Sequence, residues 1–165
     1  MSLLDSPKNY LLVSKATPFA VFILIIFGGY VKAIGAGLAC PDWPLCHNQI
    51  IPFYFDGEPV QWVLMEFLHR FIALCVSGII VGLVLFAFIH RNQDKQGIAR
   101  FYLTLLISTL LFVQILLGGL TIFSALDELI VTTHLAIAVT IFGLTIVHYN
   151  WVSIFESHYF NMSEA

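Results

Sequence analysis

The sequence has 165 residues, of which 59% are hydrophobic and only 10% carry a charge, whereas about a quarter of the residues in soluble domains are charged. This composition, with fifteen phenylalanines, excludes an ordinary small soluble domain. The net charge of -3 leaves no basic stripe for phosphates, so nucleic-acid binding is excluded as well.

Four apolar stretches are each long enough to cross a bilayer as a helix, which takes about 20 residues. They run from about residue 12 to 31, 62 to 89, 101 to 123 and 129 to 155. We therefore predict an all-α integral membrane protein, a four-helix bundle in which residues 1–165 form a single transmembrane domain. The first stretch lacks the cleavage pattern of a signal peptide, so we expect it to be retained.

Basic residues mark the expected orientation, because cytoplasmic loops are enriched in lysine and arginine. They precede the first stretch and flank the connection between the second and third: Lys8, Lys15, Arg91, Lys95 and Arg100. The loop of about residues 32–61 and the short connection after the third stretch are mostly acidic. We expect a multi-pass protein of the cell membrane with both termini cytoplasmic and the long loop outside.

The two halves of the chain resemble each other. FILIIFGGYV in the first stretch ends near Gly28-Gly29, and FVQILLGGLT in the third has Gly118-Gly119 in the matching place. This pattern predicts two helical hairpins that are parallel copies, an arrangement that usually places a functional site between the copies. The glycines allow either neighbouring helices or a flat ligand to approach closely.

Two histidines occupy matching places on the second and fourth stretches. His69 and His134 lie about 10 Å and about 8 Å inside the outer ends, at 1.5 Å per residue. An apolar bundle can hold haem between facing helices, with one histidine on each side of the iron. The alternative is a pair of core histidines satisfied by hydrogen bonds. His90 and His148, nearer the inner end, could bracket a second haem. The favoured alternative is that His90 belongs to the solvated basic boundary and that His148 is a core or interfacial residue.

Glu66 precedes His69 by three residues and so lies on nearly the same helix face. A carboxylate in the membrane is costly unless it is paired, wet or protonated. Beside a haem it could act as a general acid or base or orient water. It could equally be an interfacial carboxylate paired with Arg70, and Arg70 itself could reach a haem propionate or a lipid phosphate.

Cys40 and Cys46 lie in the loop sequence C-P-D-W-P-L-C, on the side of the membrane where disulfides persist. The prolines stiffen this short segment, so we predict a disulfide, structural or redox-active. Although His47 adjoins Cys46, two cysteines do not make a convincing zinc site.

These motifs together resemble the haem A synthase family. The resemblance rests on GGYVKAIGAGLACPDWPLC, MEFLHRFIAL, LLGGLTIFSA and TTHLAIAV, and it covers nearly all of Gly28–Val139. It implies an oxidoreductase that converts a methyl group of haem O to formyl, giving haem A for terminal oxidases. It further implies that His69 and His134 are axial haem ligands and that Glu66 is the catalytic carboxylate. Cys40 and Cys46 would form the outer disulfide.

Members of this family usually have two related four-helix bundles, one for the substrate haem and one for a b-type haem. The cysteine pair and Glu66 match the substrate-side bundle. Because electrons need a route away from the site, we expect either that copies of this chain associate or that a separate partner takes the place of the second bundle. The expected cofactor is haem, either haem B or the substrate haem O. Expected partners are the lipid bilayer, a further copy of the chain, haem O synthase and an electron acceptor. The alternative functions are a non-enzymatic b-type cytochrome, which would use His90 and His148, and a haem-delivery or assembly factor.

Overall fold

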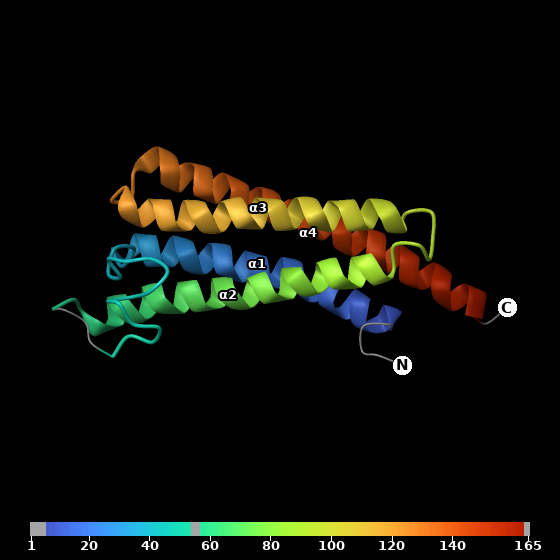
Figure 1. Ribbon diagram of the computed structural model, residues 1–165, viewed down its shortest axis with the longest axis horizontal. Coiled ribbons are helices and arrows are strands. Elements are labelled where there is room, and N and C mark those ends of the chain that lie inside the picture. Colours follow the sequence, from blue (N-terminus) through green and yellow to red (C-terminus); the bar gives the residue numbers. More distant parts are fainter. Residues whose placement is uncertain (1–5, 54–56, 164–165) are drawn as a thin grey trace.

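The computed structural model describes residues 6–53 and 57–163, and within these ranges it consists of four long helices without a β-strand (Figure 1). The helices are α1 (Pro7–Ala33), α2 (Val60–Ile89), α3 (Gly97–Phe123) and α4 (Glu128–Ser163). Each is long and apolar enough to cross a membrane. The predicted all-α membrane bundle is therefore confirmed.

Every helix is longer than the apolar stretch that predicted it. α1 begins at Pro7, which suits a first turn because its missing N–H would have no helical partner. α4 continues to Ser163, beyond the apolar stretch. A helix satisfies its own backbone in lipid and in water alike, so apolar stretches indicate the crossing rather than the helix ends.

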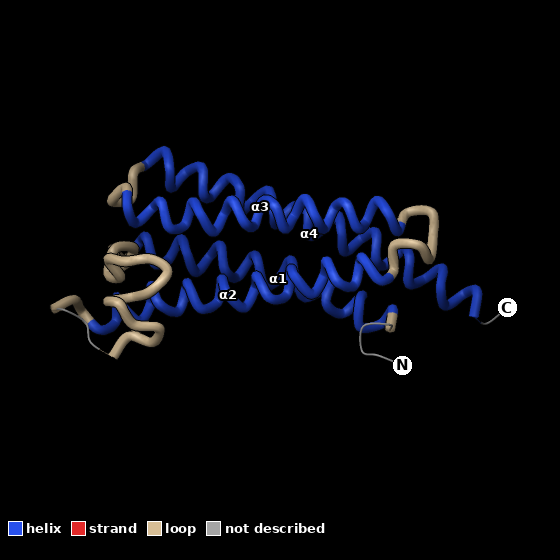
Figure 2. Tube along the Cα trace, viewed as in Figure 1, coloured by secondary structure: helices blue, strands red, loops and turns tan. Residues whose placement is uncertain are grey.

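Both described ends of the chain lie at one end of the bundle, which we call the termini end (Figure 1). The long α1–α2 connection and the short α3–α4 connection lie at the opposite end, which we call the loop end (Figure 2). Helices α1 and α3 run toward the loop end, and α2 and α4 run back. The hairpins α1–α2 and α3–α4 are therefore parallel copies, as the sequence repeat predicted.

The four helices pack as a ring. α1 packs against α2 and α4, and α3 packs against the same two helices. Within the described residues α2 and α4 do not pack against each other, so they lie across the bundle axis. Inward-pointing side chains of α2 and α4 therefore face each other.

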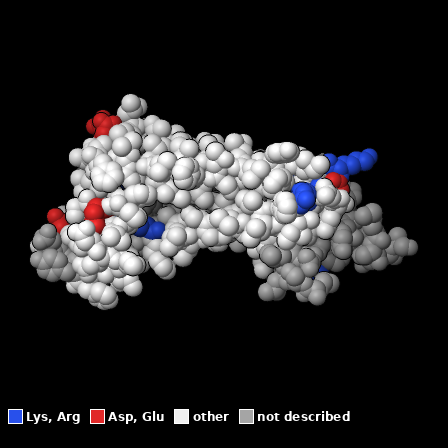
Figure 3. Space-filling view, in the orientation of Figure 1, with Lys and Arg blue, Asp and Glu red and all other residues white. Residues whose placement is uncertain are grey.

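The middle of the bundle is filled by aliphatic side chains from all four helices: Val21, Val76, Ile80, Ile107 and Ile141. Large apolar side chains cover much of the outside of each helix, as a lipid-facing surface requires. In Figure 3 the charged side chains lie toward the two ends, with an uncharged band between them. The apolar middle layer separates the polar groups at the loop end from those at the termini end.

Candidate functional site

The predicted disulfide is present at the loop end and joins Cys40 to Cys46. Both cysteines are buried and pack against Ala39 and Val63, so the loop is tied down onto the first turns of α2. Within the loop, the Asp42 carboxylate accepts backbone N–H bonds from His47 and Asn48 at 2.7 Å each. These contacts hold the cysteine loop in a compact conformation, and we call this loop the cap.

Arg70 on α2 holds this cap in place. One guanidinium nitrogen donates to the carbonyls of Asp42, at 2.7 Å, and of Leu45. The other donates to the carbonyl of Cys40 at 3.0 Å and to Glu66 Oε1 at 2.6 Å. The structure thus places Arg70 on the loop, and its predicted role toward a haem propionate stays a prediction.

Glu66 is buried under the same loop, with only 4% of its surface exposed. Its Oε1 pairs with Arg70, and its Oε2 accepts the Cys40 N–H at 2.8 Å. These two partners offset the cost of a carboxylate buried at membrane depth. Of the alternatives open in the sequence, the structure shows the pairing with Arg70, while the catalytic role stays a prediction.

His69 and His134 lie on the two helices that face each other across the bundle axis, both near the loop end. Both side chains are half-buried. The Nδ1 atom of each ring is buried without a hydrogen-bond partner, although the backbone of Gln114 lies beside His134. One ring nitrogen of His90 and one of His148 are unpaired as well, so this feature does not separate haem ligands from core histidines, and haem ligation stays a prediction.

One glycine of each pair recognised in the sequence lies against these side chains. A Cβ atom on Gly28 would lie 2.7 Å from His69 Cε1, and one on Gly118 would lie 3.4 Å from His134 Cε1. Each histidine ring is thus seated on a glycine of its own hairpin. Gly28 and Gly118 therefore face imidazole atoms, an arrangement that simple packing of one helix against another does not predict.

Trp43 is the site residue that sequence reasoning missed. A Cβ atom on Gly119 would lie 3.0 Å from the Trp43 ring, so the cysteine loop of the first hairpin rests on α3 of the second. Nearby, Gly37 faces Leu126 of the α3–α4 connection. The glycine repeat pointed to Gly119, but nothing in the sequence indicated which side chain would cover it.

His90 and His148 lie at the termini end and are almost fully buried, with 1% and 0% exposed. His148 Nε2 is hydrogen-bonded to the Tyr10 hydroxyl at 3.0 Å, and the Tyr10 ring stacks on His90 with centroids 5.2 Å apart. The Tyr10 side chain therefore contacts both imidazoles. The use of these histidines by a second haem stays a prediction.

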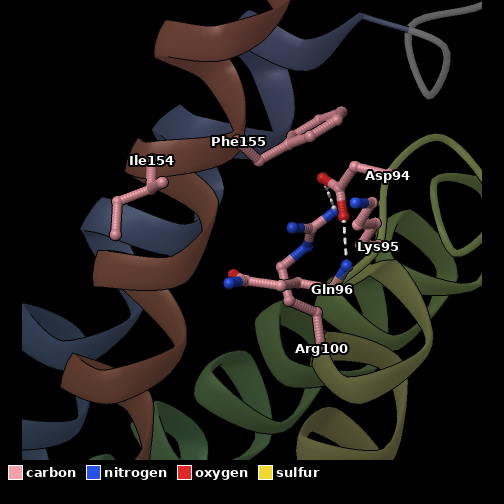
Figure 4. Close-up of a pocket in the computed structure, with 6 residues that line it drawn as sticks. All are labelled: Asp94, Lys95, Gln96, Arg100, Ile154 and Phe155. Atoms are coloured by element: carbon pink, nitrogen blue, oxygen red, sulfur yellow. Dashed lines mark hydrogen bonds and ion pairs between the residues drawn. The ribbon is translucent and has the colours of Figure 1, made fainter.

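A cavity of about 240 Å³ also opens at the termini end (Figure 4). Its lining residues come from the start of α3, the turn before it and α4: Asp94, Lys95, Gln96, Arg100, Ile154 and Phe155. Arg100 is already paired with Asp94 at 2.7 Å and lies over the Phe155 ring. The cavity lies at the opposite end of the bundle from the two half-buried histidines and is no part of their site.

The chain matches one protein family and several curated relatives. Residues 11–161 match the family model described as cytochrome oxidase assembly protein, COX15-CtaA. The chain is similar to a protein named heme A synthase from Oceanobacillus iheyensis, with 30% identity over 138 residues, 83% of this chain and 43% of that protein. A protein of the same name from Geobacillus kaustophilus is 30% identical over 126 residues, 74% of this chain and 36% of that protein.

A third protein named heme A synthase, from Orientia tsutsugamushi, is 24% identical over 152 residues, 88% of this chain and 41% of that protein. The chain therefore spans less than half the length of the curated relatives it matches. No solved structure matches it.

Proposed function

The chain belongs to the COX15-CtaA family of cytochrome oxidase assembly proteins, and from this membership we propose that it acts as a haem A synthase. In this proposal it oxidises a methyl group of haem O to a formyl group within the membrane. Haem O is the substrate, and haem A is the product used by terminal oxidases.

One observation carries the proposal: His69 and His134 lie on diagonal helices at the same end of the bundle. Two imidazoles fit the donor set of a haem iron, which accepts one from each side. Gly28 and Gly118 leave room for the two imidazole rings themselves. These residues therefore fit a haem between α2 and α4.

His69 and His134 hold the substrate haem, and Glu66 serves the oxidation from its place one turn away on α2. Each carboxylate oxygen can accept two hydrogen bonds, so Glu66 can still bind a water while it remains paired with Arg70 and Cys40. We assign it the role of orienting that water or removing a proton from it. The cysteine loop above it limits access of bulk water to the site.

The test replaces Glu66 with Gln in cells that make haem O. Glutamine keeps an acceptor for the Cys40 N–H but removes the charge, so we expect the fold to survive. Haem A formation should fall by about a hundredfold or more, the contribution typical of a general acid or base. Glu128→Gln, an exposed change at the start of α4, is the matched control. Undiminished haem A in the Glu66 variant would remove the residue from the mechanism.

Haem extraction and an optical spectrum of the purified protein separate the enzyme from the electron carrier. Haem O or haem A in the sample supports the enzyme, whereas haem B alone without conversion in cells supports a b-type cytochrome. Haem O that is bound but never converted supports a delivery factor.

A further inference from the structure

The two haem-facing histidines are not equivalent in their surroundings. Resting on the function proposed above, we propose that His69 is the fixed axial ligand, positioned by Gly28, and that His134 is the ligand that releases when haem enters or leaves. In this assignment Gly28 is a positioning residue that acts through the His69 ring.

The contact between Gly28 and His69 leaves no room for any larger residue. A Cβ atom on Gly28 would lie 2.7 Å from Cε1 and 3.2 Å from Nε2 of the imidazole. Carbon atoms that are not bonded pack at about 3.5–4.0 Å, so a methyl group there would displace the ring. The Phe27 ring also lies nearly parallel to the imidazole, with centroids 6.3 Å apart and planes 27° apart. α1 therefore confines His69 on two sides.

The corresponding contact in the second hairpin is looser. A Cβ atom on Gly118 would meet only Cε1 of His134, at 3.4 Å, which is close to ordinary van der Waals contact. Among the described residues no aromatic ring stacks on His134. The sequence repeat thus hides a difference in how closely the glycine of each hairpin approaches its imidazole.

Simple helix packing does not account for Gly28. The three atoms nearest to the place that a methyl group on Gly28 would occupy all belong to the His69 ring, and none belongs to the backbone of α2. The neighbouring Gly29 has no such atom within 4 Å. The requirement for glycine therefore concerns the orientation of one imidazole and is confined to one of the two paired positions.

This asymmetry suits a haem that is a substrate. Such a haem must enter and leave, so both axial bonds have to break, and release can begin at the ligand that is held less tightly. His69 shares a helical face with Glu66, three residues earlier, so a fixed His69 sets the position of the haem relative to the carboxylate. His134 comes from the opposite hairpin and can release the iron without disturbing that geometry.

The first test adds haem B to purified protein and measures the low-spin electron paramagnetic resonance signal and the rate of haem dissociation. For Gly28→Ala we expect a changed signal and dissociation faster by about tenfold or more, the effect typical of removing support from a metal ligand. Gly118→Ala should have a smaller effect than Gly28→Ala, and the control Gly29→Ala should stay within about twofold of the unaltered protein. Equal behaviour of the Gly28 and Gly29 variants would overturn the inference while leaving the proposed function intact.

The second test compares the histidines directly. His134→Ala should keep haem B bound through one imidazole, and His69→Ala should lose it. The reverse order of retention would overturn the assignment of fixed and releasing ligands. If the unaltered protein binds no haem at all, the proposed function fails, and this inference fails with it.

A third measurement tests the inference if the Gly28→Ala variant folds poorly. In haem-free protein, Gly28→Ala should lower the unfolding midpoint, and the same substitution in His69→Ala protein should not, because the methyl group then meets no ring. This double-mutant cycle isolates the Gly28–His69 contact. A Gly28→Ala effect that persists without the imidazole would place the clash elsewhere and overturn the inference.

Discussion

At the scale of single residues, Arg70 shows how one side chain can organise the loop end. It donates to three backbone carbonyls of the cysteine loop and to the Glu66 carboxylate. A guanidinium group offers five donors in a fixed plane, whereas a lysine ammonium is a compact point charge. Arginine is therefore suited to this position for its shape as well as its charge.

Replacing Arg70 with Lys should destabilise the protein by about 2 kcal/mol, because charged hydrogen bonds to the loop are lost. Arg91→Lys is the control, since that partly exposed side chain donates to the Phe88 carbonyl and lies over the Phe88 ring, away from the cysteine loop, and its effect should stay within about 0.5 kcal/mol. The free energy of unfolding in mild detergent measures both. Equal stability of the two variants would contradict the role given to Arg70.

At the other end of the bundle, Tyr10→Phe should cost about 1–3 kcal/mol, because it leaves the buried His148 Nε2 without a partner. Haem binding at the loop end should not change. Tyr102→Phe, on the lipid-facing side of α3, is the matched control and should be nearly neutral. Unfolding titrations and haem binding of both variants check this prediction. Loss of haem binding in Tyr10→Phe would show that the two ends of the bundle are not independent of each other.

At the scale of elements, the connections break the symmetry that the helices keep. The long α1–α2 connection reaches across to α3 and places Trp43 on Gly119. The α3–α4 connection is only a few residues long and cannot reach Gly29, which remains open. In the second hairpin Gly119 therefore supports the cysteine loop, whereas the matching Gly29 of the first hairpin faces no such side chain.

Gly119→Leu should push Trp43 away and loosen the cysteine loop, since even a Cβ atom would come within 3.0 Å of the indole. Gly29→Leu should be tolerated, because nothing lies within 4 Å of that position. The rate at which a water-soluble reductant opens the Cys40–Cys46 disulfide should rise in the first variant only. Equal rates would show that Trp43 does not hold the loop.

At the scale of the whole molecule, the ring of four helices creates one axis with α2 and α4 on either side. The proposed oxidation of a substrate on this axis would release electrons, and they would need a second redox centre within reach. The association of copies expected from the sequence stays a prediction, and this need for a second redox centre is the reason for it.

Native mass spectrometry of the protein in lipid nanodiscs should show complexes of two or more copies that carry haem. The physical reason is that a haem in a neighbouring copy can accept the electrons released by oxidation. Haem A formation by strictly monomeric protein, with no other redox protein present, would remove the need for association.

The sequence by itself determined the features that depend on local composition. Long apolar stretches must become helices in lipid because unpaired backbone groups are too costly there, so the four crossings could be predicted. The repeat of glycine pairs and histidines predicted the parallel hairpins, and the short Cys40–Cys46 spacing predicted the disulfide.

Only the tertiary structure decided the partners of individual side chains. It placed α2 diagonally from α4, turned Arg70 toward the loop, seated Trp43 on Gly119 and packed Tyr10 between the helices that carry His90 and His148. The physical reason is that partners depend on which helices are neighbours and how each is rotated about its axis. Packing across the whole bundle sets both, and no stretch of sequence contains that information.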